Sequence, residues 1–302
     1  MILKGRDISD EFILAAAMFA VMAFAAALAF HYKPSSTQGP KGEMKVTGVE
    51  AAGETPESFC KDAGEILIEV NIPATELTLY EDGIPKFRRR VAIGQGVYPT
   101  PEQATAIKGA EWNPWWYPPD APWAKGEKPT PPGPGNPMGL AKMALSREIL
   151  FHGTNKPWSV GRPASHGCMR MHNRDVTDMA WYLQQRFSSQ CDPALREQYE
   201  KQGWKTFTVK FDRPVPVHVV YRPVLAREGK LAFFKDHYNR VAGKREAAIL
   251  TELIRAGYDI EGLDEDEVKA LSERWPLEEL VDIRTLMREK SIVDFIDVPE
   301  CS

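Results

Sequence analysis

The sequence predicts a mainly β protein with an apolar helix at its N-terminus and a helical appendage at its C-terminus. Short apolar or alternating runs, separated by turn residues, follow one another from Glu65, which is typical of β-strands. Near the start, residues 12–30 form a run of 19 residues without a charge. After Arg222 the apolar residues recur at helical spacing.

The composition is that of a globular protein. The chain has 302 residues, of which 43% are hydrophobic and 26% charged. These values exclude a fully disordered, collagen-like or multi-span membrane protein. The net charge of −4 provides no basic field for nucleic acid, so no nucleic-acid partner is expected. The charge is uneven, because residues 244–302 carry −8 and residues 1–243 carry +4.

The N-terminal apolar run has the length of a membrane span. As a helix it would extend about 28 Å, close to the hydrocarbon thickness of a bilayer. Lys4 and Arg6 precede it, which favours a cytoplasmic N-terminus. We expect residues 1–31 to be an uncleaved inner-membrane anchor; a cleaved signal peptide or a buried soluble helix are the alternatives. Residues 32–64, rich in Pro, Ser, Thr, Gly, Glu and Lys, read as a linker.

Residues 65–222 are expected to form the main domain. Strands are predicted over residues 66–70, 76–80 and 87–93, and closing strands over residues 207–209 and 215–221. Residues 113–137 contain nine prolines, with four tryptophans in or beside them, and predict a stiff, ordered loop packed over the domain. These tryptophans either fix the loop or line a substrate groove.

Helices are predicted in the second half of the chain. An apolar stripe over residues 176–187, with Asn173 as N-cap, indicates a core-facing helix. Residues 223–302 should form a mainly helical extension with helices over residues 245–256, 264–275 and 277–290. Asp264 and Glu267 have the spacing of a capping box. This extension either packs against the domain or binds a partner.

The residues best suited to chemistry lie between positions 152 and 171. Cys168 is a candidate nucleophile, which requires a neighbouring base because only the thiolate attacks. His152 lies at the end of a predicted strand, which would hold a base rigidly. His166 lies two residues before the cysteine. Gly167 permits a tight turn and leaves amide groups for a developing oxyanion. Arg170 could bind a carboxylate through paired hydrogen bonds.

Two other interpretations of this segment stay open. Cys168 could be a buried structural thiol, or it could bind zinc together with His152, His166 and His172. The spacings of these four residues match no common zinc module. The other cysteines are scattered, form no C-x-x-C pair, and permit at most one internal disulfide among themselves; they are Cys60, Cys191 and Cys301.

The segment resembles the signature of the L,D-transpeptidase (YkuD-type) catalytic domain, a histidine followed about 14 residues later by Ser/Thr-His-Gly-Cys. Here the histidine is His152 and the second part is residues 165–168. The resemblance extends upstream to residues 99–101 and 133–139 and covers roughly residues 66–222. It implies a β-sandwich catalytic domain in the bacterial cell envelope that acts on peptidoglycan without a metal or organic cofactor.

The resemblance also implies a role for each matching residue. Cys168 corresponds to the nucleophile and His152 to the proton donor and acceptor, with the Gly153 carbonyl orienting the imidazole. The residues that would face the substrate or support the oxyanion are Ser165, His166, Gly167 and Arg170.

The expected reaction follows from these roles. Cys168 would attack the carbonyl of the residue before a terminal D-amino acid of a stem peptide and release that D-residue. An amine would resolve the acyl-enzyme in cross-linking or in anchoring a lipoprotein to the wall, and water would resolve it in an L,D-carboxypeptidase. A non-catalytic wall-binding or metal-binding protein is the alternative from another class.

Overall fold

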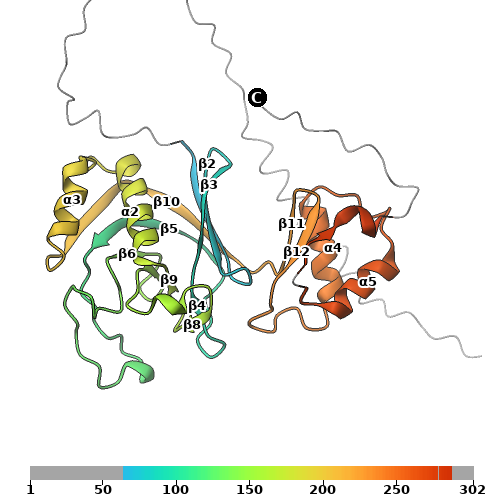
Figure 1. Cartoon of the computed structure of the whole chain (residues 1–302), viewed down its shortest axis with the longest axis horizontal. Helices are drawn as coiled ribbons and strands as arrows, with labels where there is room; N and C mark the ends of the chain where they lie inside the picture. Colours follow the sequence, from blue (N-terminus) through green and yellow to red (C-terminus); the bar gives the residue numbers. More distant parts are fainter. Residues whose placement is uncertain (1–63, 278, 288–302) are drawn as a thin grey trace, which may run out of the picture. The chain divides into compact units, whose positions relative to one another are not determined.

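The computed structural model describes residues 64–277 and 279–287. Its main element is one curled eight-stranded sheet with the strand order β3-β2-β1-β10-β5-β6-β7-β9 (Figure 1). These strands are β1 (Ile66–Asn71), β2 (Glu76–Glu81), β3 (Ile84–Arg90), β5 (Gln103–Trp112), β6 (Ala141–Ala144), β7 (Leu150–His152), β9 (Met169–Arg170) and β10 (Phe207–Val220). A short parallel pair, β4 (Ile93–Gly94) and β8 (Pro163–Ser165), accompanies the sheet.

The two predicted closing strands are parts of a single strand, β10. It has 14 residues, runs parallel to β1 and antiparallel to β5, and changes register between Lys210 and Val215. The bulge at this change includes Pro214, which has no amide hydrogen for the ladder. The polar interruption in the sequence therefore marks a bulge and not the end of a strand.

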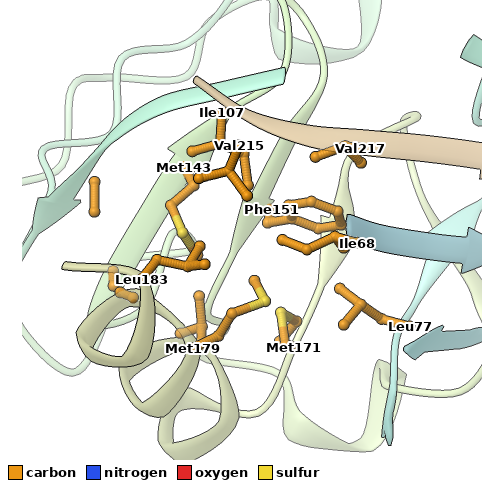
Figure 2. Packing of buried hydrophobic residues seen from close by; sticks show 14 of the residues in the cluster. Ile68, Leu77, Ile107, Met143, Phe151, Met171, Met179, Leu183, Val215 and Val217 are labelled. Atoms are coloured by element: carbon orange, nitrogen blue, oxygen red, sulfur yellow. The ribbon is translucent and has the colours of Figure 1, made fainter. Parts of the chain in front are cut away.

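The core is sandwich-like although one sheet builds it. Figure 2 shows Phe151 of β7 beside Ile68 of β1, with Met171 and Leu77 below them. Strands from opposite halves of the strand order thus bury their side chains in one cluster, because the sheet curls over itself. The expected separate sheets of a β-sandwich are replaced by this single curled sheet.

Helix α2 (Asn173–Phe187) covers the inner side of β5, β6 and β10. The predicted apolar stripe is confirmed, since it is buried against the sheet: Val176, Met179, Ala180, Leu183 and Phe187. Successive residues of a strand point to opposite faces. Met143 and Phe151 therefore face α2, whereas Lys142 and His152, their neighbours in β6 and β7, face the opposite side.

The proline-rich loop between β5 and β6 is ordered, as predicted. Its regular structure consists of a 3-10 turn, Pro122–Ala124, and an isolated antiparallel bridge between Trp116 and Thr130. The buried Asn136 amide donates to the carbonyl oxygens of Pro114 at 2.8 Å, Pro131 at 3.0 Å and Thr130 at 3.1 Å. One side chain thus supplies the hydrogen bonds that a proline-rich segment cannot form with itself.

After α3 (Pro193–Lys201) and β10, the chain forms a second core in the C-terminal extension. Strands β11 (Val224–Arg227), β12 (Lys230–Phe233) and β13 (Val281–Asp282) form a small sheet with helices α4 (Arg245–Arg255) and α5 (Glu265–Arg274). Both helices match their predictions. The Asp264 side chain caps α5 by accepting from the amides of Asp266 and Glu267.

The third predicted helix, over residues 277–290, is wrong in its described part. Val281 pairs with Leu231 of β12, and Ile283–Leu286 form a 3-10 turn. The Asp282 carboxylate accepts from the Arg284 amide at 3.0 Å and caps this 3-10 turn, so the turn begins only after β13. In its described part, the extension therefore combines two helices with a three-stranded sheet.

Across residues 64–277 and 279–287, the helices are all too short or too polar to span a bilayer. The predicted apolar helix over residues 12–30 lies outside the described residues, and so does the linker apart from Gly64.

The core predicts a sharp contrast between two isoleucines. Ile68→Ala should lower the free energy of unfolding by about 2–5 kcal/mol, because Ile68 is fully buried where the sheet closes on itself. The matched control Ile84→Ala, at a position that is 61% exposed on β3, should change it by about 0.5 kcal/mol or less. Urea denaturation would measure both, and equal effects would contradict the described core.

Candidate active site

The site is built on the parallel pairing of β7 with β9. Phe151 pairs with Met169, and His152 pairs with Arg170. Cys168 immediately precedes β9 and is two residues before Arg170, so it belongs to the same side of the strand. The register therefore places Cys168, His152 and Arg170 on the face of the sheet that is turned away from α2.

The Cys168 thiol is held by the hairpin between β6 and β7. Its Sγ lies 3.2 Å from the carbonyl oxygen of Glu148, to which it donates. Burial raises the pKa of this thiol, while a hydrogen bond from the Leu150 backbone and the positive charge of Arg170 act in the opposite direction. Burial has the larger effect, so the thiol is protonated at neutral pH.

His152 is 3% exposed, and its Nδ1 lies 2.6 Å from the carbonyl oxygen of Gly153. A carbonyl oxygen only accepts, so Nδ1 carries the proton and Nε2 of the neutral ring is the acceptor. Burial lowers the pKa of His152 to about 4, and the positive charge of Arg170 lowers it as well. The backbone carbonyls of Gly153 and Pro137 raise the pKa, but their effect is smaller. The imidazole is therefore neutral at pH 7.

Asn173 fixes the backbone around His152. It was expected to cap α2, but it is the first residue of the helix and His172 occupies the cap position. Its Oδ1 accepts from the amides of Thr154 at 3.0 Å and Leu140 at 3.2 Å. A Cβ at Gly153 would lie 2.2 Å from this Oδ1, which explains why the residue that receives the imidazole is a glycine.

Ser165 shapes the turn that leads to the cysteine. The side chain is 1% exposed, and its Oγ donates to the Cys168 carbonyl at 2.5 Å and accepts from the Gly167 amide at 3.2 Å. Gly167 has a φ of +111°, which favours glycine. Of the amides expected to be available near the sulfur, that of Gly167 is therefore already engaged. The Cys168 amide, by contrast, donates to no other group in the described part of the chain.

His166 belongs to an aromatic cluster beside the cysteine. Its ring stacks on Trp123 with centroids 4.0 Å apart and an interplanar angle of 1°, and Tyr98 meets it edge-on at 4.9 Å. Burial and Arg170 lower the pKa of His166. Trp123 therefore borders the site, whereas Trp112 is a core residue whose Nε1 donates to Gln184. That a tryptophan of this loop lines a substrate groove stays a prediction.

Arg170 is a cation beside the thiol and the imidazole. It is partly buried, burial lowers its pKa, and within the described residues no carboxylate forms an ion pair with it. A partly buried guanidinium without a partner is suited to a substrate carboxylate.

The zinc interpretation finds no matching geometry. Among residues 64–277 and 279–287, no three His, Cys, Asp or Glu side chains converge as metal ligands. His172, the fourth candidate ligand, is exposed. Cys168 is a free thiol, whereas Cys191 is disulfide-bonded. Cys60 and Cys301 lie outside the described residues.

A groove of about 400 Å³ lies on β10, β5 and β6 and reaches the β6–β7 hairpin. Its charged lining residues are Lys108, Glu111, Lys142, Arg147 and Lys210. Lys142 forms an ion pair with Glu111 at 2.9 Å, which leaves three positive charges. Since Lys142 pairs with His152 across β6 and β7, the groove opens on the same face as the thiol and the imidazole.

The sequence did not indicate several residues of this arrangement. The sequence predicts Asn173 only as a helix cap, and the contact of the Glu148 carbonyl with the thiol involves the backbone, which leaves no signal in the sequence. Thr100 is fully buried, and its Oγ1 donates to the carbonyl oxygen of Gly167 at 2.8 Å. The resemblance included Thr100 in its upstream part, but nothing in the sequence indicated which atom it contacts.

A partly buried thiol on the same sheet face as a guanidinium and an imidazole with an accepting Nε2 is a set of groups suited to nucleophilic acyl transfer. The family model of the YkuD L,D-transpeptidase catalytic domain matches residues 65–215, half of the chain. The chain therefore belongs to the L,D-transpeptidase catalytic-domain family, as the resemblance predicted.

Curated relatives carry the same family name. The chain is 50% identical over 50 residues to the putative L,D-transpeptidase YkuD of Bacillus licheniformis, a match that covers 16% of this chain and 30% of that protein. It is 33% identical over 118 residues to the probable L,D-transpeptidase ErfK/SrfK of Salmonella typhimurium, which covers 36% of this chain and 38% of that one. The matches thus span about a third of these relatives.

Among solved structures, an L,D-transpeptidase from Mycobacterium tuberculosis H37Rv matches with a TM-score of 0.31 and 16% identity, over 52% of this chain and 57% of that chain. The catalytic domain of an E. faecium L,D-transpeptidase matches with a TM-score of 0.31 and 16% identity, over 51% of this chain and 96% of that chain.

The raised pKa of Cys168 predicts slow alkylation at neutral pH. The rate of modification by iodoacetamide should increase with pH and reach its midpoint above about pH 9, because only the thiolate reacts and burial disfavours it. Mass spectrometry of the peptide that contains residue 168 would follow the reaction, with Cys168→Ser as the control that lacks this thiol. A midpoint below about pH 8 would indicate a thiolate–imidazolium pair and contradict the neutral resting state.

Proposed function

We propose that this protein is an L,D-transpeptidase that acts on peptidoglycan stem peptides through an acyl-enzyme on Cys168. The observation that carries the proposal is the shared face of Cys168, His152 and Arg170, with the His152 tautomer that leaves Nε2 free to accept a proton. Family membership supports the substrate class.

The acylation step moves one proton and exchanges one bond. Nε2 of His152 takes the proton from Sγ of Cys168 as the sulfur attacks the carbonyl carbon before the terminal D-amino acid. The resulting oxyanion accepts from the Cys168 amide. The carbon–nitrogen bond then breaks, and the imidazolium gives its proton to the departing amine. A thioester and a free D-amino acid remain.

The second step regenerates the enzyme. An acceptor amine attacks the thioester carbon and passes a proton to Nε2 of His152. The carbon–sulfur bond breaks, and the proton returns to Sγ of Cys168. With water as the nucleophile, the same step would make the protein an L,D-carboxypeptidase. Arg170 would bind a carboxylate of the donor peptide beside the thiol.

The positively charged groove favours an amine acceptor over water. The strand order places the groove on β10, β5 and β6, then His152 on β7, then Cys168 before β9. A peptide in the groove would thus reach the base before it reaches the sulfur, which is the order that an acceptor amine needs. Stem peptides carry carboxylates that the groove's lysines and arginine would attract.

We place the protein in the cell envelope. A disulfide at Cys191 is typical of an oxidising compartment such as the periplasm. Residues 65–222 would form the catalytic domain and residues 223–302 an extension. Residues 1–31 would anchor the protein in the inner membrane, with secretion after cleavage as the alternative. An outer-membrane lipoprotein is a second candidate acceptor.

The proposal predicts a cysteine-dependent acyl adduct. Wild-type protein incubated with a disaccharide-tetrapeptide should gain the mass of the donor minus the terminal D-amino acid, while Cys168→Ala should gain none and stay folded. His152→Ala should lose at least about 100-fold in acylation rate, because it removes the base. Intact-protein mass spectrometry measures both. Equal turnover by wild type and Cys168→Ala would overturn the mechanism.

The groove predicts a separable defect in the second step. The double variant Lys108→Gln/Lys210→Gln should raise the KM for the acceptor by about tenfold and leave the acylation rate unchanged, because both positive charges are two or more strands away from Cys168. Lys205→Gln/Lys230→Gln, outside the groove, is the matched control. A loss in acylation, or no change in acceptor KM, would assign the groove another role.

A further inference from the structure

The C-terminal extension reaches the candidate active site through one tyrosine. The hydroxyl of Tyr238 donates to the carbonyl oxygen of Gly94 at 2.8 Å and accepts from the amide of Thr100 at 3.1 Å. These two residues enclose the loop that follows β4. The Tyr238 hydroxyl therefore joins the two ends of this loop, because it donates one hydrogen bond and accepts another.

Thr100 extends this contact to the residue before the cysteine. Its Oγ1 accepts from the Gly94 amide at 2.8 Å and donates to the carbonyl oxygen of Gly167 at 2.8 Å. The loop is closed so tightly that a Cβ at Gly94 would lie 2.1 Å from the carbonyl oxygen of Tyr98. Tyr238 is thus connected to the Gly167–Cys168 peptide through one residue, Thr100, and two hydrogen bonds.

That peptide matters because its two ends are geometrically coupled. A trans peptide is planar, and its C=O and N–H point in opposite directions. A hydrogen bond that fixes the Gly167 carbonyl therefore also fixes the direction of the Cys168 amide. This amide has no acceptor in the described part of the chain, and it is the donor assigned above to the oxyanion.

Tyr238 is itself held in place by Tyr221, at the end of the main domain, and by neighbouring residues of the extension. Its amide donates to the hydroxyl of Tyr221 at 2.9 Å, and that hydroxyl donates to Asp236 at 2.5 Å. Asp236 also accepts from the amides of Arg240 and Val241, each at 2.9 Å. An ion pair between Arg240 of the extension and Glu102, two residues after Thr100, provides a second link between the extension and the segment that contains Thr100.

We propose that Tyr238 is a positioning residue, through which the C-terminal extension orients the Cys168 amide toward the oxyanion by way of Thr100 and the Gly167 carbonyl. The extension is then part of the active site, although none of its described residues forms a hydrogen bond with the thiol. The mechanistic part of this inference rests on the proposed acylation. The clamp itself, which is the set of hydrogen bonds that joins Tyr238, Gly94, Thr100 and Gly167, does not depend on that proposal.

Tyr238→Phe tests the inference, because it removes the hydroxyl and keeps the ring. The acylation rate constant should fall about tenfold, with little change in the KM for the donor peptide. Alkylation of Cys168 by iodoacetamide should stay within about twofold of wild type, since that reaction forms no oxyanion. The matched control is Tyr182→Phe, which loses a hydroxyl bonded to Glu81 at 2.9 Å and should acylate at the wild-type rate.

A second variant tests the route through Thr100. Thr100→Val should cause a loss like that of Tyr238→Phe, and the double variant should lose little more than either single variant, because both act on one carbonyl. Additive losses, acylation at the wild-type rate in Tyr238→Phe, or an equal loss in Tyr182→Phe would overturn the proposal.

Hydrogen exchange separates failure of the clamp from failure of the proposed function. In Tyr238→Phe, peptides that cover residues 94–100 and 165–170 should exchange at least about fivefold faster than in wild type and in Tyr182→Phe. Unchanged exchange would overturn the clamp even if activity falls. Faster exchange in a protein that no stem peptide acylates would keep the clamp and reject the proposed reaction.

Discussion

The parallel pairing of β7 with β9 is the constraint on which the site depends. Met169 of β9 is buried in the core, and side chains alternate along a strand, so Cys168 and Arg170 lie on the other face. The pairing of His152 with Arg170 brings the imidazole to that same face. A slip of one residue would bury the thiol's neighbours and expose Phe151 and Met169, at a large cost in buried apolar area. The hydrophobic core therefore holds the chemical groups in register.

Burial then sets the resting chemistry. It raises the pKa of Cys168 and lowers that of His152 to about 4, so both groups are neutral at pH 7. Ionising either one alone in this environment is unfavourable. Proton transfer becomes favourable only when the attacked carbonyl takes up the negative charge, which the amide of Cys168 would receive and Arg170 would help to balance.

The sequence predicted the features that depend on residues close to one another in the chain. The apolar stripe of α2, the Asp264 cap and the Cys168–His152 spacing all follow from neighbours in the chain. The strand at Val281 and the hydrogen bond from Thr100 to Tyr238 could not be predicted this way. Tyr238 lies 138 residues after Thr100, and only the folded chain brings them together. Asn173 was misread for the same reason, since its partners Leu140 and Thr154 come from other segments.

A crystal structure of the protein after reaction with a tetrapeptide donor would test the account most directly. The account predicts a thioester on Cys168 Sγ, with the acyl oxygen about 3 Å from the Cys168 amide nitrogen and the Gly167 carbonyl still bound to Thr100. An acyl group on another residue would contradict it. An acyl oxygen pointing away from that amide, with the Gly167–Cys168 peptide turned over, would contradict it equally.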